Sequence, residues 1–167
     1  MFTVRKATKE DAELILTLAL QVFPQTYREI LSPEQSAYMM SYMYTPTKTR
    51  QAIDEGYVYF ILSKDGQDCG YLSIIQENKD LFVLRKIYIL PDFQGAGAGT
   101  FLFETGIEYM QQIHPEPFVL ELKVHRDNEG AIAFYQKMGM TIDYAGDFPI
   151  GNGFIMKDYV MRIKVGR

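Results

Sequence analysis

One segment of the chain combines a strand end, a glycine-rich loop and a helix start, and it reads Ile87-Tyr88-Ile89-Leu90-Pro91-Asp92-Phe93-Gln94-Gly95-Ala96-Gly97-Ala98-Gly99-Thr100. An apolar run ends at Leu90, and Pro91 stops it because proline has no N–H to donate to a strand ladder. Glycine permits positive φ and lets a ligand approach the backbone closely. A helical pattern begins near Ala98, and the free N–H groups of a helix start bind anions. The segment therefore predicts a phosphate-binding loop between a strand and a helix.

Three kinds of glycine loop compete for this segment. A P-loop ends in Gly-Lys-Ser/Thr, whereas here Thr100 follows Gly99 directly, without a lysine. The dinucleotide fingerprint needs a third glycine where Thr100 stands, although Glu116 or Glu121 would supply its acidic residue. That alternative is weakened but stays open. The third pattern, Gln-x-x-Gly-x-Gly, is matched by Gln94, Gly97 and Gly99.

The rest of the chain reads as one α/β domain over residues 1–167. Period-two patterns and turn signals predict strands at 2–7, 57–63, 69–76, 81–90, 118–124, 141–148 and 153–165. Apolar stripes and cap residues predict helices at about 8–22, 25–31, 33–44, 47–55, 98–113 and 128–138, with Pro24 stopping or re-aiming the first. The strand before the glycine loop is apolar on both sides, so helices should cover both faces of the sheet. A βαβ unit at the centre and an antiparallel start are expected.

Composition and charge narrow the classes of function. The 167 residues carry a net charge of −4, which argues against general nucleic-acid binding. A single cysteine, Cys69, excludes an internal disulfide and a thiol cluster for metal. No apolar run approaches the roughly 20 residues of a membrane span, and the first residues lack a signal peptide. We therefore expect a cytoplasmic protein without a membrane partner.

A second motif follows the glycine loop after one expected helix and one expected strand, and it reads Asn128-Glu129-Gly130-Ala131-Ile132-Ala133-Phe134-Tyr135-Gln136-Lys137-Met138-Gly139-Met140. In this order the two motifs resemble the pyrophosphate loop and the Asn…Ala…Phe-Tyr-x-Lys-x-Gly-Phe helix of the GNAT superfamily of N-acetyltransferases. The resemblance implies a mixed, mostly antiparallel sheet of six to seven strands with helices on both faces. Within the family, Phe23-Pro24-Gln25-Thr26-Tyr27 and Gly153-Phe154-Ile155-Met156 look most like the bacterial spermidine/spermine acetyltransferase type.

The resemblance also implies ligands. The co-substrate would be acetyl-CoA, without a metal, and the acceptor would be a primary amine of a small, polyamine-like molecule or of a peptide. Family members are often homodimers. The residues expected to bind the cofactor are Ile87, Tyr88 and Ile89 at the pantetheine arm; Gln94, Gly95, Ala96, Gly97, Ala98, Gly99 and Thr100 at the pyrophosphate; Asn128 at the arm; Tyr135 near the sulfur; and Lys137 at the phosphates or adenosine end.

The glycine loop departs from the family pattern at one position. The family often has arginine where this chain has Gln94, and no lysine or arginine occurs between Lys86 and Lys123. The phosphate site is therefore expected to rest on backbone N–H groups and the helix dipole, which contribute up to about 2 kcal/mol.

Acetyl transfer to an amine needs proton chemistry. An alkyl ammonium of pKa about 10.4 is neutral in roughly 1 molecule in 2,500 at pH 7, which costs about 4.6 kcal/mol. Tyr135 suits the proton donor to the leaving thiolate, unless it is only a packed core tyrosine. The proton acceptor stays open among Glu77, Glu121, His125 and a water relay.

The acceptor site is expected in the N-terminal half. The segment 38–44 is rich in tyrosine and methionine and apolar on nearly all sides, so it is either core or the lining of a groove. Aromatic faces attract a cation, and the residues expected at the acceptor are Tyr27, Met39 and Tyr42. The alternative function is a domain of the same fold that binds an acyl-CoA as a sensor without turnover.

Overall fold

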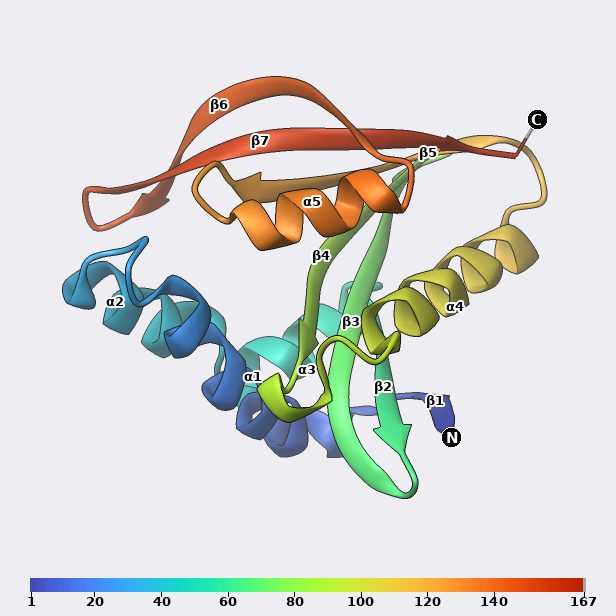
Figure 1. Ribbon diagram of the computed structural model, residues 1–167, viewed down its shortest axis with the longest axis horizontal. Helices are drawn as coiled ribbons and strands as arrows, with labels where there is room; N and C mark the ends of the chain where they lie inside the picture. Colours follow the sequence, from blue (N-terminus) through green and yellow to red (C-terminus); the bar gives the residue numbers. More distant parts are fainter. Residues whose placement is uncertain (167) are drawn as a thin grey trace.

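The computed structural model describes residues 1–166, in which seven strands form one sheet and five α-helices cover it (Figure 1). The strands are β1 (Phe2–Lys6), β2 (Val58–Lys64), β3 (Gln67–Asn78), β4 (Leu81–Ile89), β5 (Phe118–His125), β6 (Thr141–Gly151) and β7 (Phe154–Val165). The helices are α1 (Ala12–Tyr27), α2 (Pro33–Met43), α3 (Pro46–Asp54), α4 (Ala98–Ile113) and α5 (Glu129–Lys137), with 3-10 turns η1 (Lys9–Asp11) and η2 (Pro91–Phe93). The predicted mixed α/β fold is confirmed.

The sheet is split near its middle. Its order is β1-β2-β3-β4-β5-β7-β6, and every neighbouring pair is antiparallel except β4 and β5. These two parallel strands pair over three residues only, ending at Val83 and Glu121. Beyond that point β4 turns away from β5, as Figure 1 shows. A slot therefore opens between the second half of β4 and β5.

A bulge in β4 decides which of its side chains reach each face. Ser73 on β3 pairs with Lys86, and the next residue, Ile74, pairs with Leu84, so Arg85 is an extra residue. A bulge of this kind resets the alternation of side chains along the strand. Lys86 consequently shares a face with Val83, although the two are an odd number of positions apart.

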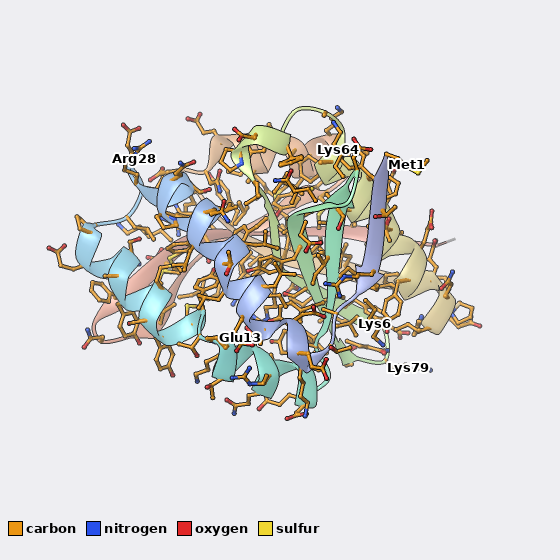
Figure 2. All side chains as sticks on the ribbon, turned by 90° about the horizontal axis from the view of Figure 1, so that it is seen from below. Met1, Lys6, Glu13, Arg28, Lys64 and Lys79 are labelled. Atoms are coloured by element: carbon orange, nitrogen blue, oxygen red, sulfur yellow. The ribbon has the colours of Figure 1, made fainter. Side chains whose placement is uncertain are left out.

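The helices divide between the two faces. α4 packs closely on β3 at Gly106. A side chain at this position would clash, because a Cβ on Gly106 would lie 2.6 Å from the Leu72 side chain. The face of the sheet that α4 covers is called the α4 face, and α5 lies beside α4 on this face (Figure 1). The α1 face carries α1, α2 and α3, and there the ring of Tyr44 lies 5.2 Å from that of Phe23. Figure 2 shows α1 along this face, with Glu13 near its start and Arg28 just past its end.

The main correction to the sequence prediction concerns α1. Pro24 was expected to stop or re-aim this helix, with a second helical piece at 25–31, but α1 continues through it to Tyr27. Pro24 and Leu20 are both exposed, so the Leu20 carbonyl that loses its N–H partner faces water. The segment after Tyr27 is a turn. Within residues 1–166, no helix is both long and apolar enough to cross a membrane.

Candidate functional site

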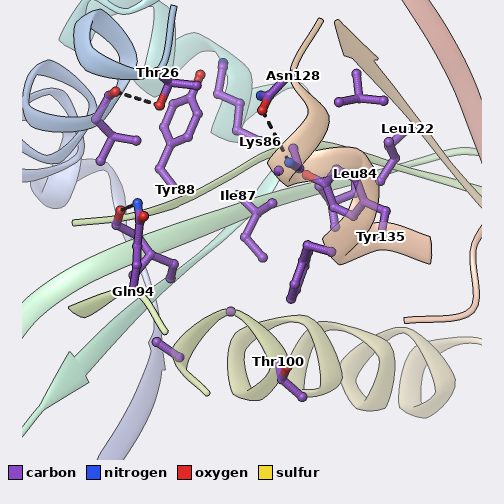
Figure 3. Close-up of a pocket in the computed structure, with 18 of the residues that line it drawn as sticks. Thr26, Leu84, Lys86, Ile87, Tyr88, Gln94, Thr100, Leu122, Asn128 and Tyr135 are labelled. Carbon is purple, nitrogen blue, oxygen red and sulfur yellow. Dashed lines mark hydrogen bonds between the residues drawn. The ribbon is translucent and has the colours of Figure 1, made fainter. Parts of the chain in front are cut away.

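The slot between β4 and β5 opens into a cavity of about 560 Å³ (Figure 3). The end of β4, the loop into α4, β5 and α5 line it, and the last turn of α1 closes one side with Val22, Thr26 and Tyr27. Of the residues predicted to bind the cofactor, those that line it are Ile87, Tyr88, Ile89, Gln94, Gly95, Gly97, Ala98, Gly99, Thr100, Asn128, Tyr135 and Lys137. Ala96 lies in the same loop but outside the lining. One cavity thus gathers segments far apart in sequence, while their role in cofactor binding stays a prediction.

The start of α4 leaves backbone donors at the cavity. Gly97 is the N-cap, with φ 84°, a conformation that favours glycine. It has no side chain to cap the helix, and the first helical bond runs from Phe101 N to the Gly97 carbonyl oxygen at 2.9 Å. The N–H groups of residues 98–100 therefore have no helical partner. Free N–H groups at the positive end of a helix dipole suit an anion.

Two contacts hold this loop in place. The Gln94 side-chain amide donates to the Ile89 carbonyl oxygen at 2.9 Å, which ties the loop to the end of β4 (Figure 3). A Cβ on Gly99 would lie 3.2 Å from the Phe134 ring, so this glycine lets α5 approach α4. Gln94, which stands where the family often has arginine, therefore holds the backbone of the loop in place and adds no charge.

α5 brings a tyrosine to the cavity. Its N-cap is Asn128, whose side-chain oxygen accepts from Ala131 N at 3.3 Å. One face of the helix then places Tyr135 against the cavity, where the residue is 8% exposed. Burial, and after it the Tyr27 phenol, raises the pKa of Tyr135. The hydroxyl therefore keeps its proton at neutral pH.

The wall on the α1 face consists of tyrosines and one lysine. The hydroxyls of Tyr44 and Tyr88 lie 2.6 Å apart. The Nζ atom of Lys86 lies 4.8 Å from the centre of the Tyr44 ring, and Figure 3 draws its side chain between those of Tyr88 and Asn128. Burial, and then the neighbouring Arg85, lowers the pKa of Lys86 to about 8. Lys86 is thus an ammonium group in a largely dehydrated place.

Tyr27 connects this wall to β5 and β7. Its ring lies 6.5 Å from the His125 ring. Burial, and then the Asp158 charge, raises the pKa of Tyr27 to about 12, while the Asn128 side chain opposes the shift. Burial also lowers the pKa of His125, whose Nδ1 accepts from Asp127 N at 3.1 Å.

The two carboxylates predicted as proton acceptors lie elsewhere. Glu77 and Glu121 line an adjoining hollow of about 400 Å³, which shares Leu84, Arg85 and Lys123 with the main cavity. Glu77 pairs with Arg85 at 3.3 Å, and Glu121 pairs with Arg162 at 2.6 Å. Each carboxylate already has a cationic partner, so the geometry favours neither as the base.

Of the three predicted acceptor residues, only Tyr27 lines the cavity. Met39 is 4% exposed and packs in the core. Tyr42 is 52% exposed and stacks on Tyr38, with ring centres 5.5 Å apart. A helix that is apolar on nearly all sides does not reveal from sequence which side meets the cavity. The role of Tyr27 at the acceptor stays a prediction, and Tyr27 is the one of these three residues that lies at the cavity.

Neither Lys86, which lines the cavity, nor the buried Asp158 was predicted from the sequence as a site residue. Asp158 carried a visible signal, since it alternates with the buried Met156 and Val160 on the core-facing side of β7. Lys86 carried no such sequence signal, because the face of the sheet on which its side chain lies depends on the bulge at Arg85. Among residues 1–166, no group of three His, Cys, Asp or Glu side chains is placed to hold a metal ion.

Comparison with known proteins identifies the class. Residues 23–140 match the model of the acetyltransferase (GNAT) family, and the chain belongs to this family. It is 28% identical over 145 residues to an uncharacterized N-acetyltransferase of Methanocaldococcus jannaschii. That alignment covers 83% of this chain and 60% of the relative, so the chain spans less than two thirds of the relative's length. The resemblance to GNAT proteins is thereby confirmed.

Solved structures share the fold. The PaiA N-acetyltransferase of Thermoplasma acidophilum, solved in complex with coenzyme A, superposes with a TM-score of 0.83 at 20% identity over 99% of both chains. Mutant forms of the spermidine/spermine N-acetyltransferase SpeG of Vibrio cholerae give 0.68 at 18% identity, over 98% of this chain and 93% of that one. At these identities the likeness concerns the fold alone.

Proposed function

We propose that the protein transfers the acetyl group of acetyl-CoA to a primary amine of a small molecule or peptide. The observation that carries the proposal is a continuous cavity that joins the free N–H groups at the start of α4, the open side of β4 and the hydroxyl of Tyr135. The pyrophosphate would bind at the N–H groups, with Lys137 nearby. The pantetheine arm would lie along β4 and bring the thioester toward Tyr135.

The reaction would form a C–N bond and break a C–S bond. The amine first loses one proton, because only its neutral form has the lone pair that attacks the thioester carbonyl carbon. The electron pair of the C–S bond leaves on sulfur, and Tyr135 donates its proton to that thiolate. The amine nitrogen releases its second proton as the amide forms. Water in the cavity would return a proton to Tyr135.

A release assay tests this function. The protein is incubated with acetyl-CoA and a panel of polyamines, amino acids, aminoglycosides and peptides, and free CoA is measured with a thiol reagent. We expect release with at least one class of amine. Binding of acetyl-CoA without release for any amine would contradict the proposal and support the sensor alternative. The homodimer expected from the resemblance stays a prediction, which light scattering after size-exclusion chromatography would test.

A further inference from the structure

Two charged side chains lack a partner of opposite charge: Lys86, which lines the cavity, and Asp158, which lies near the lining residue Tyr27. Lys86 is half-buried, and none of the ion pairs within residues 1–166 includes it. Its contact is with the face of the Tyr44 ring. Asp158 is 6% exposed, and its Oδ1 is buried without a hydrogen-bond partner. Such groups are costly in a folded protein, so each suggests a missing ligand group.

Both side chains belong to the α1 face and meet the same tyrosines. Lys86 lines the cavity, and so does Tyr27. Tyr27 in turn lies close enough to Asp158 for the aspartate charge to raise the pKa of its phenol. In the sheet, Asp158 is flanked by His125 on β5 and by Gly146 on β6, and the Phe148 ring lies over Gly146. Tyr27 therefore shares the cavity with Lys86 and lies within reach of the Asp158 charge.

The cations near Asp158 are engaged elsewhere. Arg126 directs its guanidinium to the Asp147 carboxylate and the Gly146 carbonyl oxygen, and Lys123 lies 3.9 Å from the centre of the Phe148 ring. Burial accordingly raises the pKa of Asp158 to about 6, against the lowering effect of these two cations. An ammonium group from a ligand would complete this site.

We infer that the acceptor carries a carboxylate as well as its primary amine, with Lys86 binding the carboxylate and Asp158 binding the ammonium group. This inference rests on the proposed acetyl transfer and narrows its acceptor to amino acids and related amino-carboxylates. A polyamine has only positive charges, so its remaining charge would be repelled by Lys86. Of the two acceptor classes predicted from sequence, the polyamine-like one is therefore disfavoured.

The same arrangement supplies the proton acceptor. The bound ammonium passes one proton to an Asp158 oxygen, which leaves the neutral amine that attacks the thioester. Asp158 then releases this proton to solvent after the product leaves. The balance of the step is an ammonium and a thioester converted into an amide, a thiol and one proton.

The first test compares amino acids with their amides, which keep the amine and lose the carboxylate. L-alanine, L-methionine, β-alanine and γ-aminobutyrate are each assayed against the matching amide, with spermidine as the polyamine. We expect kcat/KM to be about 10- to 100-fold higher for at least one acid than for its amide, as for one charge-assisted hydrogen bond. Equal values for every pair, or the highest value for spermidine, would overturn the inference.

The second test removes the lysine. Lys86→Met should abolish the preference for the acid, because kcat/KM for the acid should fall about 10- to 100-fold further than kcat/KM for the amide. Lys86→Arg should restore most of the preference, and Lys164→Met, at an exposed position on β7, should change nothing. Because Lys86 is half-buried without a counter-ion, Lys86→Met should unfold at a higher temperature than the wild type, and that result would exclude misfolding as the cause. An equal loss with acid and amide would contradict the assignment.

Failure of this inference is distinguishable from failure of the proposed function. Turnover of amines without any preference for acids sinks the inference alone. If no amine supports CoA release, the preference for acids is still measurable by calorimetric titration of the CoA-loaded protein with the same acid–amide pairs. Tighter binding of the acid, lost in Lys86→Met, supports the inference, and equal binding rejects it.

Discussion

The cavity has two walls that are built from different parts of the chain. The cofactor wall uses backbone groups, namely the open edge of β4 and the N–H groups of residues 98–100, in a stretch without lysine or arginine. The acceptor wall, as proposed above, uses side chains: Lys86 and Tyr27 line the cavity, and Asp158 lies near Tyr27. A backbone wall tolerates replacement of most side chains, provided that the glycines remain. A side-chain wall can be altered one residue at a time, so the acceptor can change while the donor stays the same.

The largest expected effect is at Tyr135, where the two walls meet. Tyr135→Phe should lower the rate of CoA release about 100-fold, as expected for loss of a general acid, because the leaving thiolate loses its proton donor. The dissociation constant of acetyl-CoA should change less than about twofold, since the ring and its packing remain. Stopped-flow or steady-state assays and calorimetry measure the two quantities. Turnover equal to the wild type would remove Tyr135 from the mechanism.

The next effect tests the acceptor wall through pH. The pKa of Asp158 is about 6 in the folded protein against 3.8 without the fold, so the folded state holds this proton more tightly. Asp158 therefore adds stability that is fully present below pH 4 and is lost as pH rises through 6. The whole contribution is on the order of 2–3 kcal/mol.

Asp158→Asn removes this dependence. The difference in free energy of unfolding between variant and wild type, measured by urea titration at several pH values, should move in favour of the variant between pH 4 and 7. Asp92→Asn, at an exposed position in η2, is the control and should show no such change. A difference that stays constant with pH would mean that Asp158 titrates normally.

The cofactor wall is tested at a glycine. Gly97→Val forces a β-branched residue to φ 84° at the N-cap of α4 and should weaken CoA binding about tenfold by displacing the free N–H groups. Gly153→Val is a matched control, because Gly153 has φ 79° in the β6–β7 turn and, like Gly97, nothing within 4 Å of an added Cβ. Calorimetry should show weaker binding for the first variant only. Equal losses in both would indicate general strain.

The smallest effect concerns salt. A backbone site should lose less than about threefold in CoA affinity between 0.05 and 0.5 M sodium chloride, because screening acts mainly on exposed charged side chains. Lys137 is the cation that lines the cavity on α5, so Lys137→Met should flatten even this slope. A steep slope that persists in the variant would show that other cations dominate cofactor binding.

Sequence reasoning predicted most of the residues that line this part of the cavity, because their signals are local. The glycine loop and the helix that bears Tyr135 are each contiguous, and their order along the chain matches the family. The residues of the acceptor wall come from α1, β4 and β7, so they become neighbours only after folding. The side chain of Lys86 lies on the α1 face because of the bulge at Arg85, and no local sequence pattern predicts this bulge. Likewise, α1 runs through Pro24 because the surroundings of that proline are open to water.

The short pairing of β4 with β5 has a consequence for how the molecule holds together. Strands β1 to β4 form one antiparallel unit with mostly local contacts, and β5, β7 and β6 form another, with only three residue pairs of parallel ladder joining them. Hydrogen exchange should therefore resolve two cooperative units of unequal stability, instead of one transition across the whole sheet. A ligand in the slot touches both units at once and couples their opening. Bound acetyl-CoA would thus stabilise the association of the two strand units, in addition to serving as a substrate.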